Sequence, residues 1–273
     1  MRWALATIMM ILGIAFVMNY SGATQTLGLA LARRSLIKTL RQPEQLLDVT
    51  LQPVMFVVLF VYLLGGAIAG NTTLYLQFLL PAIMVQQVMF AGMATGTNLN
   101  SDIHKGVFDR LRSLPIGRSA PLVGSVLGDL IRYVVAITVL LVFGAVLGFK
   151  FTAGFLPILA ACLLTILFAF SVSWLFVFIG MLVREPGAVQ GLAFLILFPF
   201  TFGTSMIAPA VTLPGWLQTW VEINPVAHVM DMARGLMLTG TTTGGALVWT
   251  LATSAGFLAV FAPLAVRAYM RRT

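Results

Sequence analysis

Six apolar runs, each of about 20 residues or more, constrain this sequence more than any other feature. A helix needs roughly 20 apolar residues to cross about 30 Å of hydrocarbon, and only helices and closed barrels satisfy their backbone hydrogen bonds there. The runs lack the alternation of polar and apolar residues that is typical of barrel strands. They predict an all-α integral membrane protein with six transmembrane helices at about residues 48–69, 75–97, 122–148, 155–183, 188–207 and 243–267.

Composition agrees with a membrane protein. Hydrophobic residues make up 60% of the 273 residues and charged residues only 9%, whereas about a quarter of a soluble domain is charged. The single cysteine, Cys162, lies within a predicted span. An intrachain disulfide is therefore impossible, and Cys162 is interpreted as a small apolar packing residue.

Lysine and arginine predict the orientation, because cytoplasmic loops carry an excess of these residues. If the segment before the first span is cytoplasmic, only Lys150 and Arg234 are placed outside, while Arg132 lies at a membrane edge and Arg2 is not assigned. Both ends of the six-span core are then expected in the cytoplasm. The net charge of +8 is explained by this topology and by anionic lipid headgroups, so it requires no nucleic-acid partner. The cytoplasmic residues are Arg33, Arg34, Lys38, Arg41, Lys105, Arg110, Arg112, Arg118, Arg184, Arg267, Arg271 and Arg272.

The N-terminal segment divides into two parts. Residues 1–25 form an apolar extension that fits a signal-like segment, an interfacial helix or a misassigned start. A seventh span is less favoured, because it would place Arg2 and the basic residues from Arg33 to Arg41 on opposite sides of the membrane. Residues 26–41 place leucines on one helical face and basic residues on another, which predicts an elbow helix in the headgroup plane; the alternative is a basic flank of the first span. The basic residues are Arg33, Arg34, Lys38 and Arg41.

The segment from Asn100 to Pro121 is unusually polar for this chain. From Asp102 to Leu114 its apolar and charged residues fall on opposite faces of a helix, and Pro115 ends the pattern. The spacing predicts a short amphipathic cytoplasmic helix. By charge pattern alone, a solvated loop explains the segment slightly better.

The region from Ala208 to Gly240 is interrupted by prolines but rich in apolar residues. Trp216 and Trp220 are typical of a membrane interface. We expect two short helices that dip into the outer leaflet or lie on it. Asp231 and Arg234 are spaced i, i+3 on one of them and can neutralise each other.

Residues for catalysis or nucleotide binding are not evident. His104 and His228 are expected on opposite sides of the bilayer, so they cannot share a metal site, and no Cys/His ligand spacing occurs. The lysines do not follow the spacing of a phosphate-binding loop. Asp129 and Arg132, spaced i, i+3, are interpreted as a structural pair. The sequence predicts that this chain is not an enzyme and that any ATP is bound by another chain.

Four polar residues within spans are candidates for a substrate route: Gln86, Gln87, Ser171 and Ser173. The alternative, interhelical hydrogen bonding, is worth about 0.6 to 2 kcal/mol per contact. The sequence favours this alternative slightly.

Three stretches together resemble the type-2 ABC transporter permeases, especially the daunorubicin/doxorubicin-resistance export permeases of actinobacteria. They are "LARRSLIKTLRQPEQLLDVTLQP", "DIHKGVFDRLRSLPIGRSAPLVGSVLGDLIR" and "NPVAHVMDMARGLMLTG". The resemblance covers about residues 26–272, which would be a single transmembrane domain. Residues 1–25 depart from the family pattern.

The resemblance implies a bacterial plasma-membrane permease that pairs with a second copy or a related permease and binds two cytoplasmic ABC ATPase subunits. ATP and Mg would bind to those subunits, and this chain would hold no cofactor. It also implies export of a hydrophobic drug, antibiotic or lipid-like compound by alternating access. Alternatives are export of polysaccharide, glycolipid or haem, and, outside the family, an ATP-independent secondary transporter or a membrane-embedded transferase.

The resemblance also assigns residues. A coupling helix from about Asp102 to Leu114 would contact the ATPase through Gly106, Phe108, Asp109, Arg110, Leu111, Arg112, Leu114 and Pro115. Phe108 and Leu111 would be its apolar contacts. Extracellular re-entrant helices would contain Trp216, Trp220, Asn224, Pro225, Asp231 and Arg234.

Overall fold

The computed structural model describes residues 43–107 and 120–272, and over these residues it is helical with no strand. The expectations for residues 1–25 and for the elbow helix at 26–41 lie outside the described residues. The helices are α3 (Pro43–Ala69), α4 (Thr72–His104), α6 (Ala120–Val146), α7 (Phe155–Leu182), α8 (Pro186–Phe202), the 3-10 turn η1 (Ala210–Thr212), α9 (Gly215–Ile223), α10 (Pro225–Leu238) and α11 (Gly244–Arg272).

Five of the described helices are long and apolar enough to cross a membrane: Leu51–Ala69 of α3, α4, Leu122–Val146 of α6, α7 and Gly244–Arg271 of α11. The run expected to be the fifth span forms α8, an apolar helix of only 17 residues. It ends at Gly203, where a Cβ atom would lie 2.5 Å from the Pro199 carbonyl oxygen and 2.9 Å from Nε1 of Trp220. Glycine permits this close approach, and the chain turns there toward α9 and α10.

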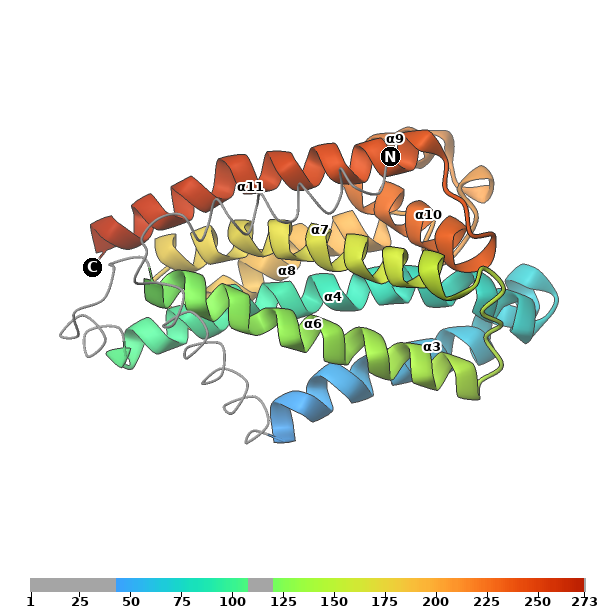
Figure 1. The fold of residues 1–273 in the computed structure, drawn as a ribbon, viewed down its shortest axis with the longest axis horizontal. Helices are drawn as coiled ribbons and strands as arrows, with labels where there is room; N and C mark the ends of the chain where they lie inside the picture. Colours follow the sequence, from blue (N-terminus) through green and yellow to red (C-terminus); the bar gives the residue numbers. More distant parts are fainter. Residues whose placement is uncertain (1–42, 108–119, 273) are drawn as a thin grey trace.

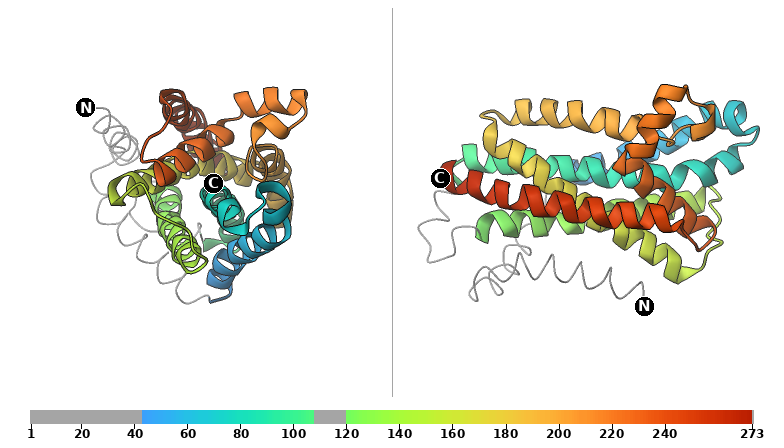
Figure 2. Two further views of the ribbon diagram at one scale, coloured as in Figure 1. Left: turned by 90° about the vertical axis from the view of Figure 1, so that its right-hand side faces the viewer. Right: turned by 90° about the horizontal axis from the view of Figure 1, so that it is seen from above.

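The long helices run side by side, and α9 and α10 lie at one end of the bundle (Figures 1 and 2). We call this end the α10 end. The opposite end, which contains the C-terminus of α11 and residues His104 and Arg184, is called the basic end. α4 is central, since it packs against α3, α6, α7, α8 and α10. In the most apolar part of α4, 78% of the residues are buried, against 17% in the most apolar part of α11. α4 therefore forms the core of the bundle.

α4 and α7 approach each other closely toward the basic end. A Cβ atom on Gly96 would lie 2.3 Å from the Phe176 carbonyl oxygen, and one on Gly180 would lie 2.6 Å from that of Gly96. Small residues permit such contact between membrane helices. One turn further on, Nδ2 of the buried Asn100 donates to the carbonyl oxygens of Gly180 (2.7 Å) and Val183 (2.8 Å). The His104 ring also contacts the Arg184 carbonyl oxygen, so the two helix ends are fixed together.

The start of the amphipathic segment differs from the sequence expectation. Residues Asp102 to His104 form the last turn of α4, Lys105 caps that helix, and Gly106 has a positive φ of 64°. Val107 is helical again. The expected helix from Asp102 is therefore interrupted at Gly106, because this left-handed conformation ends α4. Residues 108–119, with most of the predicted ATPase-coupling residues, lie outside the described residues.

Candidate functional site

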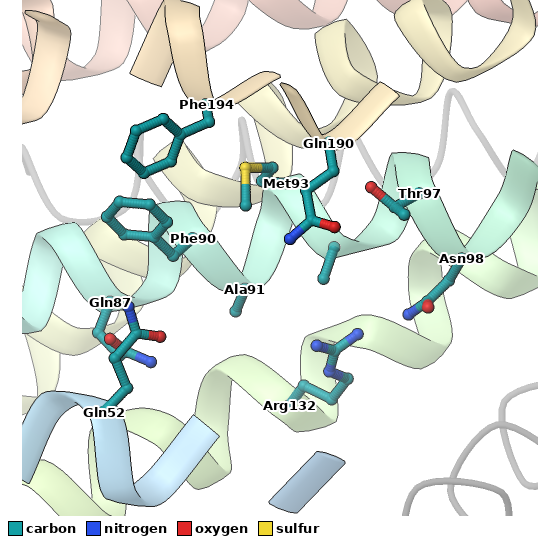
Figure 3. Close-up of a pocket in the computed structure, with 11 residues that line it drawn as sticks. Gln52, Gln87, Phe90, Ala91, Met93, Thr97, Asn98, Arg132, Gln190 and Phe194 are labelled. Atoms are coloured by element: carbon teal, nitrogen blue, oxygen red, sulfur yellow. The ribbon is translucent and has the colours of Figure 1, made fainter. Parts of the chain in front are cut away.

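A pocket of about 470 Å³ lies between α3, α4, α6 and α8. Amide, hydroxyl and guanidinium groups share its wall with two phenylalanines (Figure 3). The lining residues are Gln52, Gln87, Phe90, Ala91, Met93, Ala94, Thr97, Asn98, Arg132, Gln190 and Phe194.

α4 supplies most of the pocket wall. Gln87, Ala91, Ala94 and Asn98 are spaced i, i+4, i+7 and i+11, which places them in one row along a helix. The two alanines in the middle of the row leave room between the longer polar side chains at its ends. Helical periodicity alone therefore aligns Gln87 and Asn98 on the same face of α4.

Phe90 on α4 and Phe194 on α8 form the apolar part of the wall. Their ring centroids are 6.1 Å apart with an interplanar angle of 42°, a separation within the range of favourable aromatic pairs. Phe194 also contacts Phe198 at 5.6 Å. The pocket thus offers polar groups on one side and aromatic surface on the other.

Among the described residues that line the pocket, Arg132 on α6 is the cation. It is only 7% exposed, and its Nη1 lies 3.4 Å from Oδ1 of Asp129. Its Nε has no hydrogen-bond partner among the described residues. Figure 3 shows the guanidinium of Arg132 and the amide of Gln190 directed toward the same space. An ionisable side chain within a membrane span is costly, so its presence favours a functional role.

The four residues predicted to line a substrate route separate into two groups. Gln87 lines the pocket. Gln86 is buried beside it, with Nε2 lacking a partner among the described residues. Ser171 and Ser173 are buried in α7 and donate to carbonyl oxygens of their own helix, at Leu167 (2.7 Å) and Phe170 (2.7 Å). The pocket lining does not include either serine.

A second polar cluster, at the α10 end, surrounds Arg234. Nη1 of Arg234 donates to Oδ1 of Asp231 at 2.9 Å, Nε to the Phe78 carbonyl oxygen at 3.1 Å and Nη2 to the Ser205 carbonyl oxygen at 3.1 Å. Its Cζ also lies 3.9 Å from the centroid of the Phe78 ring. Burial lowers the pKa of Arg234, and the Asp231 charge opposes that shift. The predicted pair of Asp231 and Arg234 is formed, and it joins α10 to α4 and to the segment after α8.

Asn224 and Pro225 begin α10. Asn224 is 1% exposed; its Oδ1 accepts from the Val226 backbone N–H at 2.9 Å, and its Nδ2 donates to the Phe200 carbonyl oxygen at 2.9 Å. Pro225 occupies the first turn, where its missing N–H is not needed. The Trp220 ring packs edge-on against Phe200 at 5.3 Å, whereas Trp216 is exposed. The helices expected between Ala208 and Gly240 are present, and Asn224 attaches them to α8.

Comparison with known proteins identifies the family. The family model described as "ABC-2 type transporter" matches residues 26–238. The chain belongs to this family. The match contains every residue of the pocket and of the Arg234 cluster.

Named relatives of this ABC-2 type transporter agree with that assignment. This chain is 45% identical over 230 residues to the daunorubicin resistance ABC transporter permease protein DrrB1 of Streptomyces coeruleorubidus. The match covers 84% of this chain and 81% of that protein. It is 27% identical over 221 residues to the probable doxorubicin resistance ABC transporter permease protein DrrC of Mycobacterium tuberculosis, covering 78% of each. A putative transport permease, ycf38, of Cyanophora paradoxa is 24% identical over 210 residues, or 76% of this chain and 72% of that protein.

Sequence reasoning missed several pocket residues of this ABC-2 type transporter. Arg132 was interpreted only as the partner of Asp129, and Gln52, Asn98 and Gln190 were not singled out. The i, i+11 spacing of Gln87 and Asn98 could have identified one wall. No comparable signal links this wall to Gln52 and Gln190, because they lie on other helices and reach the pocket only through packing.

Proposed function

We propose that this chain is the permease subunit of an ATP-driven exporter. The observation that carries the proposal is the 45% identity to a daunorubicin resistance ABC transporter permease over most of both chains. Two copies, or this chain and a related permease, would form the membrane part, with two cytoplasmic ABC ATPases binding ATP and Mg.

The cargo we propose is a hydrophobic drug, antibiotic or lipid-like compound. The names of the DrrB1 and DrrC relatives support a drug. The pocket supports an amphiphilic molecule, because Phe90 and Phe194 offer aromatic surface beside the amides of Gln87 and Gln190. Polysaccharide, glycolipid or haem export is the alternative within the family.

The proposed orientation places the basic end in the cytoplasm of a bacterial plasma membrane. Lys105, Arg184, Arg267 and Arg271 belong to loops or helix ends at the basic end, whereas the α10 end has Lys150 and Arg234. This distribution supports the orientation through the positive-inside rule. The segment after Gly106 would then face the ATPase.

The mechanism we propose is alternating access driven through residues 106–115. The most buried helix, α4, leads directly into this segment, and Asn100 joins the end of α4 to α7 through two hydrogen bonds. A force applied at Gly106 would therefore move α4 and α7 together. Nucleotide must bind the two permease states with different affinity for such coupling to occur.

The test uses the chain co-expressed with an ABC ATPase that co-purifies with it and reconstituted in vesicles. We expect daunorubicin to stimulate ATP hydrolysis and to be transported. Phe108→Asp or Leu111→Asp should reduce both rates about tenfold or more by introducing an unpaired charge into the apolar contact. Val211→Asp is the matched control, because Val211 is 83% exposed at the opposite end. Wild-type stimulation and transport in both coupling variants would contradict the proposed role.

A further inference from the structure

We propose that the pocket around Arg132 binds the anionic headgroup, phosphate or carboxylate, of an amphiphilic molecule whose apolar part lies against Phe90 and Phe194. The headgroup could belong to a membrane lipid or to an acidic cargo. The lipid source is independent of the proposed function, whereas the cargo source rests on it.

The first step is the unused hydrogen-bonding capacity of Arg132. A guanidinium has five N–H donors, yet the contact of Arg132 with Asp129 is 3.4 Å long and Nε has no partner among the described residues. A charge-assisted hydrogen bond is usually about 2.7–2.9 Å long. Arg132 is only 7% exposed, so water does not freely supply the missing hydrogen bonds of its guanidinium. Its planar donors match the geometry of a phosphate or carboxylate.

The second step is the charge of the lining. No aspartate or glutamate is among the described residues that line the pocket; Asp129, which contacts Arg132 at 3.4 Å, is not one of the lining residues. Gln190 and Asn98 add amide donors. The hydroxyl of Thr97 has no partner among the described residues and adds another donor. A cationic group would lose hydration in this pocket and gain no opposite charge, which favours an anionic group over a cationic one.

The third step is the arrangement of polar and apolar surface. The Phe90 and Phe194 rings form one side of the pocket, while Arg132 lies across it on α6 (Figure 3). Beyond Phe194 the outer face of α8 is apolar, with Leu195 70% and Phe198 48% exposed. A molecule with its acidic group on Arg132 can therefore extend an alkyl chain or ring system past Phe194 along apolar surface.

The test measures binding by the full-length chain, purified in dodecyl maltoside, with n-dodecyl phosphate as the probe. Native mass spectrometry gives the bound fraction at each probe concentration, and dodecyltrimethylammonium provides the same alkyl chain with a cationic head. We expect the chain to retain dodecyl phosphate and not dodecyltrimethylammonium. Arg132→Gln should weaken phosphate binding about tenfold or more, as expected for lost charge-assisted hydrogen bonds. Arg267→Gln, with the same charge change at an exposed site of α11, should bind like the wild type.

A second variant keeps the test decisive if Arg132→Gln fails to fold. Asp129→Asn with Arg132→Gln removes both charges of this pair together. This double variant should fold and lose the preference for phosphate over ammonium. Equal phosphate binding by the wild type and the folded variants, or an equal loss in Arg267→Gln, would overturn the proposal.

Two further arms distinguish the source of the headgroup. In the first, vesicles of phosphatidylcholine with and without phosphatidylglycerol are used to reconstitute the chain with its ATPase. If the headgroup belongs to a lipid, phosphatidylglycerol should stay bound to the chain during ATP turnover. If it belongs to the cargo, a fluorescent acidic amphiphile should be transferred in an ATP-driven step, and Arg132→Gln should reduce the rate of that transfer. In the second, daunorubicin-stimulated ATP hydrolysis is measured on the same vesicles. Failure of the wild-type chain to bind dodecyl phosphate, with normal daunorubicin stimulation, would reject the anionic site and leave the proposed function standing.

Discussion

Two Asp-x-x-Arg pairs, Asp129–Arg132 on α6 and Asp231–Arg234 on α10, have the same spacing but different surroundings. Arg234 makes three hydrogen bonds of 3.1 Å or less and covers the Phe78 ring. Arg132 has a 3.4 Å contact with its aspartate and an Nε without a partner among the described residues. Equal spacing therefore produces a satisfied structural cation in one place and a cation with unused donors in the other.

The largest expected effect comes from removing the satisfied cation. Arg234→Gln leaves the carbonyl oxygens of Phe78 and Ser205 without their donor and removes the charge that balances Asp231. Because the Arg234 side chain is mostly buried while Asp231 is about half exposed, the loss comes mainly from the two carbonyl oxygens left without a donor and should lower the free energy of unfolding by about 3 kcal/mol. Thermal unfolding of the detergent-solubilised chain, followed by intrinsic tryptophan fluorescence, measures the change.

The control for Arg234→Gln is Arg267→Gln, which makes the same replacement at an exposed position. Its effect should stay within about 0.5 kcal/mol. If the two variants unfold at the same temperature, the hydrogen bonds of Arg234 do not stabilise the α10 end as the geometry indicates.

The sequence predicted both pairs but not the difference between them. An i, i+3 spacing on a helix brings the two side chains of each pair together regardless of the fold. The remaining partners of Arg234 lie 156 and 29 residues away, at Phe78 and Ser205, and no local pattern connects them. Whether a buried cation finds hydrogen-bond acceptors depends on tertiary packing. The difference between Arg132 and Arg234 is therefore seen only in the structure.

The same limit applies to the helices. Apolar runs predicted the long helices well, because length and composition alone determine which segments can cross a membrane. The length of the short helix α8 was overestimated, since it ends before Gly203, where Trp220 of α9 leaves no room for a larger side chain. The end of α4 was misplaced for a different reason: periodicity continues through Asp102 to Leu114, but Gly106 breaks the helix backbone.

A smaller effect is expected from the residue that attaches α10 to α8. Asn224→Ala removes the N-cap of α10 and the donor to the Phe200 carbonyl oxygen. The expected loss is about 2 kcal/mol, from a cap and a buried hydrogen bond together. Asn71→Ala is the matched control, because Asn71 caps the start of α4 with a 2.7 Å bond to the Thr73 N–H at an exposed site. Its loss should be about 1 kcal/mol or less, and an equal loss in both variants would contradict a role for Asn224 beyond capping.

The smallest effect on stability is expected from neutralising the other pair. Replacing a buried ion pair by neutral groups of similar size is often close to neutral, so Asp129→Asn with Arg132→Gln should change the free energy of unfolding by no more than about 1 kcal/mol. The equivalent double variant, Asp231→Asn with Arg234→Gln, should still lose about 3 kcal/mol, because glutamine cannot reach both the Phe78 and Ser205 carbonyl oxygens. Paired unfolding curves of the two double variants measure the contrast directly. If the α6 variant is the less stable of the two, Arg132 is retained for the fold, and its unused donors are not evidence of a ligand.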